Sequence, residues 1–247
     1  MASFPTTIPV DDSRISSGDG GIRPPIRNGG DDGHPGRELP DYRTRLRRAR
    51  LGLLVALTPV LMLFVSFTSA YIVRQGLPTF DPATNTLVRD WIPVKLPTLL
   101  FFNTCILLLS SVAMELARRH LNAQAALARA NSVPRVNLGT AKKPAWLALT
   151  FVLGFCFLFG QWLAWRQLAA RGFYVSTTPS SSFVYLLTGA HAIHLLGGVF
   201  ALGVAGILAL LRRPVETRSI VVDVTAWYWH FMALLWVYIL CLLEFAH

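Results

Sequence analysis

Acidic residues are scarce in this chain of 247 residues, which has 13 Asp and Glu against 23 Lys and Arg. None of the 13 lies deep within a long hydrophobic stretch. Cysteine is also rare, and Cys105, Cys156 and Cys241 each lie in an apolar run without the CxxC spacing of a zinc site or a redox pair. We therefore expect these cysteines to be packing residues.

Hydrophobic residues, by contrast, make up 53% of the sequence, and the mean hydropathy is +0.47. Such a composition is typical of a membrane protein. The net charge is +10, but the arginines gather between hydrophobic stretches, where they set membrane topology. Nucleic acid is therefore not an expected partner.

Five hydrophobic stretches are each long enough to cross the ~30 Å apolar core of a bilayer as a helix. They cover about 49–73, 96–117, 145–168, 183–211 and 225–246. We predict an all-α integral membrane bundle of five transmembrane helices, which occupies residues 48–247.

The flanks of these stretches carry an uneven distribution of basic residues. In the flanks and loops, fourteen Lys and Arg lie on the side of the membrane where the first helix begins. Five lie on the opposite side of the membrane. Because basic loops stay in the cytoplasm, we predict a cytoplasmic N-terminus and a periplasmic C-terminus.

Residues 1–47 are predicted to form a cytoplasmic tail that is rich in Gly and Pro and then basic. Residues 1–42 have too little apolar surface to offset the entropy of ordering, so they should be disordered alone and gain order only against a partner. The tail lacks the apolar segment of a signal peptide, and we expect no cleavage. The basic run RTRLRRAR at 43–50 should lie on anionic lipid headgroups.

Three histidines are the main ionisable residues within the hydrophobic stretches: His191, His194 and His230. Imidazoles on two helices could ligate haem or copper. However, the two helices enter the membrane from opposite sides, which leaves an axial mismatch of roughly 6 Å or more between the histidine pair and His230. We expect neutral, hydrogen-bonded histidines that join helices. A redox protein that carries haem or metal on all three is the alternative.

Two carboxylates lie near the cytoplasmic ends of predicted helices. Glu115 precedes Arg119 by four residues, the favourable order for an ion pair on a helix, and a proton-uptake carboxylate is the alternative role. Asp223 is expected to pair with Arg218 or with a neighbouring subunit. The adjacent Trp-His-Phe stretch around His230 should meet a lipid phosphate or a neighbouring subunit.

Small and polar residues predict where the helices meet. Asn103, Ser110 and Met114 share one face of the second helix and indicate a buried seam. The fourth helix carries small residues at four-residue spacing, which favours close helix packing. These are Gly197, Ala201, Ala205 and Ala209.

Three motifs taken together resemble subunit III of the haem-copper oxygen reductases, which include cytochrome c oxidase. They read FNTCILLLSSVAMELA at 102–117, TGAHAIHLLGG at 188–198 and TAWYWHFMALLW at 225–236. The first and third hydrophobic stretches fit the same family in order and spacing, so the resemblance covers about 49–247. It corresponds to the five-helix form, which lacks the first two of the seven helices found in larger members.

The resemblance implies a non-redox accessory subunit of a terminal cytochrome c oxidase in a bacterial inner membrane. Such a subunit stabilises the catalytic subunit I, binds phospholipid and supports proton uptake while O₂ is reduced to water. Haem and copper are expected in the partner subunits, and the resemblance implies no metal site and no catalytic residue in this chain. Subunits II and IV are further expected partners, and the N-terminal tail is expected to reach a larger respiratory assembly. An accessory subunit of a quinol oxidase or a nitric oxide reductase is the alternative.

Contact with lipid or with another subunit is expected of eight residues. They are Asn103, Glu115, Gln161, His191, His194, Trp229, His230 and Trp236. Many family members carry carboxylates at three places where this chain has none. Pro59 and Val60 replace the first, Ala164 the second and Ala233 the third. The scaffold and lipid roles depend less on those carboxylates than a proton-carrying role would.

Overall fold

The structure is a computed structural model that describes residues 42–81, 85–88, 91, 96–130, 145–211 and 214–245. The predicted disordered tail lies outside the described residues, apart from Tyr42 at its end. The basic run at 43–50 lies inside them and is helical.

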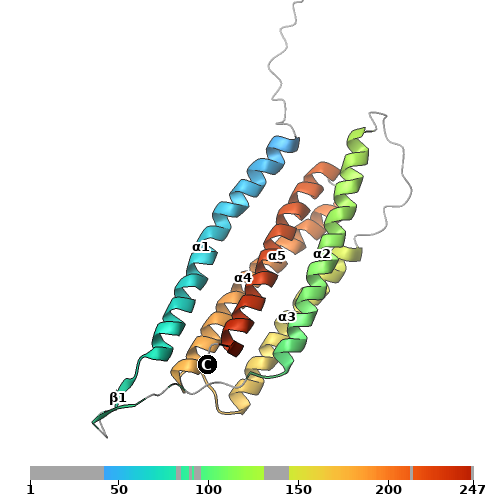
Figure 1. Ribbon diagram of the computed structural model, residues 1–247. Helices are drawn as coiled ribbons and strands as arrows, with labels where there is room; N and C mark the ends of the chain where they lie inside the picture. The colour runs from blue at the N-terminus through green and yellow to red at the C-terminus, as the bar shows by residue number, and fades with distance from the viewer. Residues whose placement is uncertain are drawn as a thin grey trace, which may run out of the picture. The chain divides into compact units, whose positions relative to one another are not determined.

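Five long helices make up most of the described chain (Figure 1). They are α1 (Tyr42–Gly76), α2 (Leu99–Ala130), α3 (Ala145–Ala170), α4 (Pro179–Leu210) and α5 (Val215–Phe245). All five are long and apolar enough to cross a membrane. The predicted all-α bundle of five transmembrane helices is therefore confirmed.

A short antiparallel hairpin follows α1 and was not predicted. Strand β1 (Thr79–Asp81) pairs with β2 (Thr86–Val88), with Phe80 opposite Leu87. Asn85 precedes β2 with a φ of 53°, a left-handed conformation that asparagine adopts more readily than most residues.

Helix α4 begins earlier than its apolar run because a capping box fixes its start. The Thr178 hydroxyl accepts a hydrogen bond from the Ser181 amide, and the Ser181 hydroxyl accepts one from the Thr178 amide. Pro179 occupies the first turn, where its missing N–H needs no helical partner. The helix therefore starts four residues before the predicted stretch.

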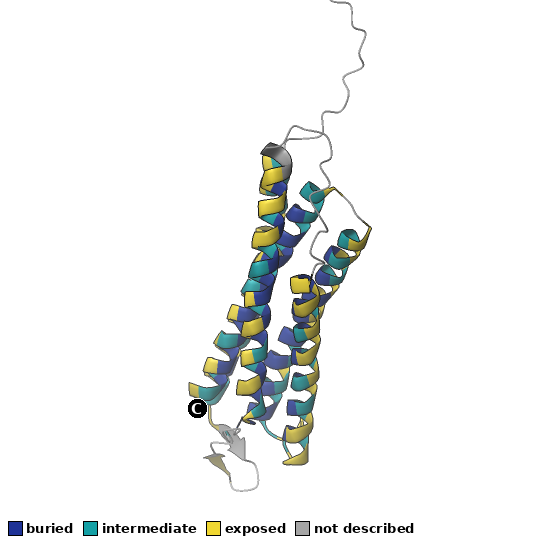
Figure 2. Ribbon diagram, turned by 90° about the vertical axis from the view of Figure 1, so that its right-hand side faces the viewer, coloured by how far each residue is buried: buried dark blue, intermediate teal, exposed yellow. Residues whose placement is uncertain are grey.

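Helices α2 to α5 pack around one core, and α1 contacts α4 and α5 from the edge (Figure 1). Figure 2 shows buried residues on the helix faces that meet and exposed residues on the outward faces. The predicted seam on α2 is confirmed, since Asn103, Ser110 and Met114 are all buried. Asn103 donates to the Phe157 carbonyl at 3.0 Å, and Ser110 donates to a second α3 carbonyl.

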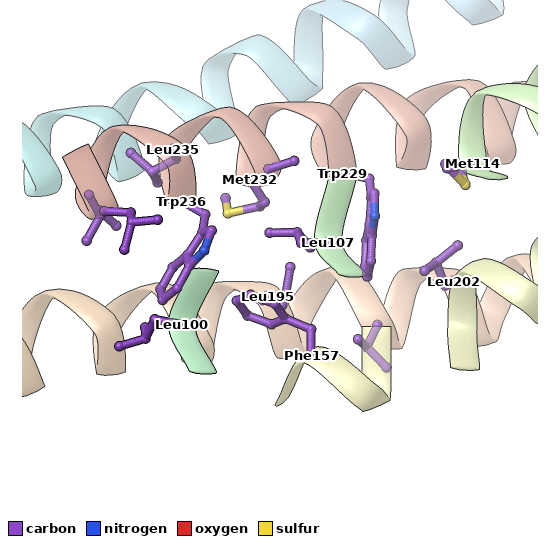
Figure 3. Packing of buried hydrophobic residues seen from close by; sticks show 14 of the residues in the cluster. Leu100, Leu107, Met114, Phe157, Leu195, Leu202, Trp229, Met232, Leu235 and Trp236 are labelled. Atoms are coloured by element: carbon purple, nitrogen blue, oxygen red, sulfur yellow. The ribbon is translucent and has the colours of Figure 1, made fainter. Parts of the chain in front are cut away.

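Trp229 of α5 occupies the junction of three helices and is fully buried (Figure 3). Glycines on both neighbouring helices make room for its indole. A Cβ at Gly154 of α3 would come within 2.8 Å of the ring, and a Cβ at Gly198 of α4 within 3.2 Å. The close approach on α4 thus occurs at Gly198 and not at Gly197, the exposed residue at which the predicted stripe begins.

Candidate functional site

One end of the bundle, where α1 and α5 begin and α2 ends, gathers the charged residues into a network. We call it the basic end and define it by Arg50, Arg118, Arg119, Glu115 and Asp223. Its centre is the Asp223 carboxylate, which is only 1% exposed. A buried carboxylate is stable only when it is paired and hydrogen-bonded, so its partners decide how this end is held together.

Two arginines from different helices bind Asp223. Arg50 of α1 donates two hydrogen bonds, at 2.8 and 3.0 Å, in the bidentate geometry typical of strong arginine–carboxylate pairs. Arg118 of α2 donates a third at 3.3 Å. One carboxylate of α5 therefore binds an arginine on α1 and another on α2, and it joins the three helices. The predicted pairing of Asp223 with Arg218 is wrong, because Arg50 and Arg118 take its two oxygens.

Glu115 forms a second cluster beside the first. Arg119 donates to it at 2.8 Å, so the predicted ion pair is present. Arg118 also donates to both Glu115 oxygens, and it thereby links the two carboxylates. The predicted i,i+4 pair is thus one part of a larger network that spans three helices.

His230 joins α5 to α2 at the same end. Its Nδ1 hydrogen-bonds the Ser111 hydroxyl, and its Nε2 lies 3.4 Å from a Glu115 oxygen. The prediction of a histidine that joins helices is confirmed at this position. The arrangement places an imidazole between a hydroxyl and a carboxylate at the edge of the bundle, a set of groups that can hold and pass protons.

The other two histidines differ from one another. His194 hydrogen-bonds through Nδ1 to the Ala190 carbonyl of its own helix, and the Tyr228 hydroxyl donates to the His194 carbonyl at 2.7 Å. His191 is fully buried, and neither ring nitrogen has a hydrogen-bond partner among the described residues. The expectation of a hydrogen-bonded histidine is therefore wrong for His191.

Aromatic rings surround His191 instead. Its centroid lies 5.0 Å from the Trp236 ring and 6.0 Å from the Phe157 ring. These distances are typical of paired rings, which gain stabilisation beyond the area they bury. Trp236 itself is anchored by its indole N–H, which donates to the Thr104 hydroxyl at 2.9 Å. His191 therefore belongs to an aromatic layer between α3, α4 and α5.

Four more of the predicted contact residues lie inside the bundle. Asn103, Gln161, Trp229 and Trp236 are each at most 1% exposed. Glu115, His194 and His230 are partly exposed, so they are the members of the set that can reach a molecule outside the chain.

From the sequence, two members of the basic end, Arg50 and Arg118, are assigned no contact and count only as basic residues that set topology. Both bond Asp223, and Arg118 also bonds Glu115. Ser111 is likewise assigned no contact, although it hydrogen-bonds His230. Arg118 could have been found, because its spacing of three residues from Glu115 also favours an ion pair. The contact between Arg50 and Asp223 leaves no local signal, because 173 residues separate them.

The described residues contain no group of three or more His, Cys, Asp or Glu side chains that could hold a metal ion. His191 is enclosed by aromatic rings, while His230 is bonded to Ser111 at the basic end. The three histidines therefore do not form one site in the part of the chain that the structure describes.

The chain is similar to several known proteins. Among curated relatives, a probable cytochrome c oxidase subunit 3 of Mycobacterium tuberculosis is 32% identical over 107 residues, which is 40% of this chain and 49% of the relative. The cytochrome c oxidase subunit 3 of Corynebacterium diphtheriae is 29% identical over 37% of this chain and 45% of its own. The wheat (Triticum aestivum) protein of that name is 26% identical over 77% of this chain and 65% of its own.

These alignments span between about half and two thirds of the relatives' own length. The profile of the family described as cytochrome c oxidase subunit III matches residues 44–245, which include nearly all of the described helices. The chain therefore belongs to the cytochrome c oxidase subunit III family.

Proposed function

We propose that this chain is a non-redox accessory subunit of a terminal cytochrome c oxidase, held against the catalytic subunit I in a bacterial inner membrane. The family match over residues 44–245 carries the proposal. The pairing of the buried Asp223 carboxylate with Arg50 of α1 and Arg118 of α2 supports it, since this charge is used to hold the helices of the chain together. Haem and copper belong to the partner subunits, and subunits II and IV complete the complex.

The basic end faces the cytoplasm in this proposal, so that the N-terminus lies inside and the C-terminus in the periplasm. Arg50, Arg118 and Arg119 support this orientation, because basic residues near helix ends are retained on the cytoplasmic side. Glu115, His194 and His230 make the contacts with lipid or with other subunits. The buried members of the predicted set act indirectly by fixing the helices that carry them.

In this proposal the chain supports proton uptake by the oxidase through groups at its basic end. We assign that support to the row formed by Ser111, His230 and Glu115, which lies where α2 and α5 meet. The family carboxylates that Pro59, Val60, Ala164 and Ala233 replace are absent from this chain. We therefore assign the larger part of its role to keeping the complex intact during turnover.

Comparison of early and late turnover tests this function. Oxidase purified without this chain should start at a rate close to that of the complete complex and then lose activity faster during sustained O₂ reduction. The control is the same preparation with the chain restored, which should regain the lifetime. An immediate loss of rate in proportion to the chain removed would contradict the proposal.

A further inference from the structure

One ring nitrogen of His194, on α4, has no hydrogen-bond partner among the described residues. The other, Nδ1, lies 2.7 Å from the Ala190 carbonyl oxygen. A carbonyl oxygen can only accept, so Nδ1 carries the proton of that hydrogen bond. A charged imidazole is costly within a bilayer, and the ring is therefore neutral. In that tautomer Nε2 is an acceptor, and no described residue donates to it.

This nitrogen is open to a molecule outside the chain. His194 is partly exposed, and its Nε2 is not one of the side-chain atoms that the described residues bury without a hydrogen bond. It differs in this from His191, whose two ring nitrogens are both enclosed. An unpaired acceptor costs free energy in an apolar medium, so a donor from outside the chain would stabilise it.

The depth of His194 indicates which kind of molecule supplies that donor. His194 lies halfway along the 32 residues of α4, roughly 23 Å from either end of the helix. When the helix is centred on a ~30 Å apolar core, the imidazole lies near the bilayer midplane, roughly 15 Å from the headgroups. An acyl chain carries no donor at that depth, whereas a transmembrane helix can place a hydroxyl, an amide or an indole there.

The side of α4 that carries His194 allows another helix to approach closely. Its neighbours on that side, at intervals of three or four residues, are all small. They are Ala190, Gly197 and Ala201. Gly197 is exposed and the two alanines are partly exposed, so α1, whose Phe64 ring lies 5.8 Å from the His194 ring, covers only part of this side. Small residues at such intervals let the backbones of membrane helices come close together.

We propose that this side of α4 receives one transmembrane helix of a neighbouring subunit, which donates a side-chain hydrogen bond to Nε2 of His194. We call it the His194 face and define it by Ala190, His194, Gly197 and Ala201. The inference rests on the proposed function, because it requires the chain to be part of an assembly, and it assigns the contact of His194 to protein and not to lipid. The small residues set the distance between the two helices, and the hydrogen bond sets their register.

Two substitutions at position 194 separate the outward hydrogen bond from the local one. His194→Asn reaches only as far as Nδ1, so its amide keeps the bond to the Ala190 carbonyl but offers no outward acceptor. His194→Gln reaches the position of Nε2 with an amide oxygen, which is an acceptor. Interhelical hydrogen bonds in membranes contribute about 0.6 kcal/mol on average, which corresponds to a roughly threefold change in affinity.

The measurement is how much of the neighbouring subunit stays on a tagged chain after the complex is washed with detergent. His194→Asn should retain about threefold less than wild type. His194→Gln should retain close to the wild-type amount. Equal retention by the two variants, at any level, would overturn the proposed hydrogen bond.

Filling the His194 face tests the close approach of the helix. A Cβ at Gly197 would make only an ordinary contact within the chain, 3.6 Å from the Tyr228 hydroxyl. Gly206→Leu is the matched control, because Gly206 lies on the opposite side of α4 and a Cβ there meets nothing within 4 Å. Gly197→Leu should retain roughly tenfold less of the neighbouring subunit, while Gly206→Leu should retain the wild-type amount.

A photo-crosslinking residue at position 204 identifies the occupant. Val204 is 38% exposed and lies two turns beyond Gly197 on the same side of α4. In the assembled complex the crosslinker should form an adduct with one other polypeptide, identified by mass, and Gly197→Leu should reduce that adduct. An adduct with lipid alone would overturn the inference.

Failure of this inference can be distinguished from failure of the proposed function. If the tagged wild-type chain recovers no oxidase at all, the proposed function fails and the inference fails with it. If it recovers oxidase but Gly197→Leu and Gly206→Leu behave alike, only the inference about the His194 face fails.

Discussion

Helices α1 and α5 are similar in length, and both are apolar enough to cross a membrane, but they differ in how much of their surface the bundle buries. Their most apolar windows have hydropathies of 2.2 and 1.7, yet 17% of that window is buried in α1 and 50% in α5. Helix α5 carries Trp229, Trp236 and Asp223, which between them contact all four of the other helices. Helix α1 contacts α4 and α5 along one face.

The comparison shows that hydropathy sets where a helix can cross a membrane but not what it meets there. Lipid tails are as apolar as leucine, so association between membrane helices depends on close packing and polar contacts. Helix α5 makes both close packing contacts and polar contacts along the faces that it buries in the bundle. Helix α1 is held by three polar contacts with α5, which are Tyr42 with Ser219, Arg50 with Asp223 and Thr68 with Tyr238. Its buried Phe64 and Tyr71 add apolar packing.

Truncation of the central tryptophan should give the largest effect. Trp229→Ala removes a fully buried ring from a three-helix junction, and we expect it to lower the free energy of unfolding by about 3–5 kcal/mol. Met62→Ala on α1 is the comparison, since Met62 is 60% exposed and should change stability little. Unfolding of the purified chain in mixed micelles measures both. Equal losses would break the contrast between the two helices.

Loss of the buried carboxylate should give a smaller effect, concentrated on α1. Asp223→Asn removes the negative charge and one of the two oxygens that accept hydrogen bonds from Arg50 and Arg118, so we expect a loss of about 2 kcal/mol and faster proteolysis near the start of α1. Glu216→Gln, in the first turn of α5, provides a matched change of charge and should cost less than about 1 kcal/mol. If Glu216→Gln lowered the free energy of unfolding as much as Asp223→Asn, the proposed role of Asp223 in joining α5 to α1 and α2 would be contradicted.

The smallest effect is expected at the opposite end of the contact between α1 and α5. Tyr238→Phe removes the hydroxyl that donates to Thr68 at 3.1 Å. Interhelical hydrogen bonds in membranes contribute about 0.6 kcal/mol on average, so a change of that size is expected in the same unfolding measurement. The Asp223→Asn/Tyr238→Phe double variant should release α1 further, and its protection from hydrogen exchange should fall more than in either single variant.

Features set by local spacing could be predicted from the sequence. The five helices follow from the length of the apolar runs, the ion pair of Glu115 with Arg119 from an interval of four residues, and the seam from residues that share a helical face. The resemblance drawn from the motifs is confirmed by the family match. These signals lie within one helix or in the order of helices, and they need no knowledge of how the helices meet.

Contacts between helices could not be predicted in the same way. The partners of Asp223 are 105 and 173 residues away, and several arginines were equally good candidates by charge. Close approach on α4 occurs at Gly198 because the Trp229 indole lies there, which depends on the rotation of two helices. His191 is enclosed by rings from α3 and α5, so its lack of a hydrogen bond is also a property of the packed bundle.

Purification of a tagged chain from its native membrane tests the central claim most directly. We predict that the tag recovers a complete oxidase, with haem and copper in stoichiometric amounts and one copy of this chain per catalytic subunit. Separated from its partners, the chain should then be colourless and metal-free. Recovery of the chain alone, with its own Soret band or bound copper, would contradict the account.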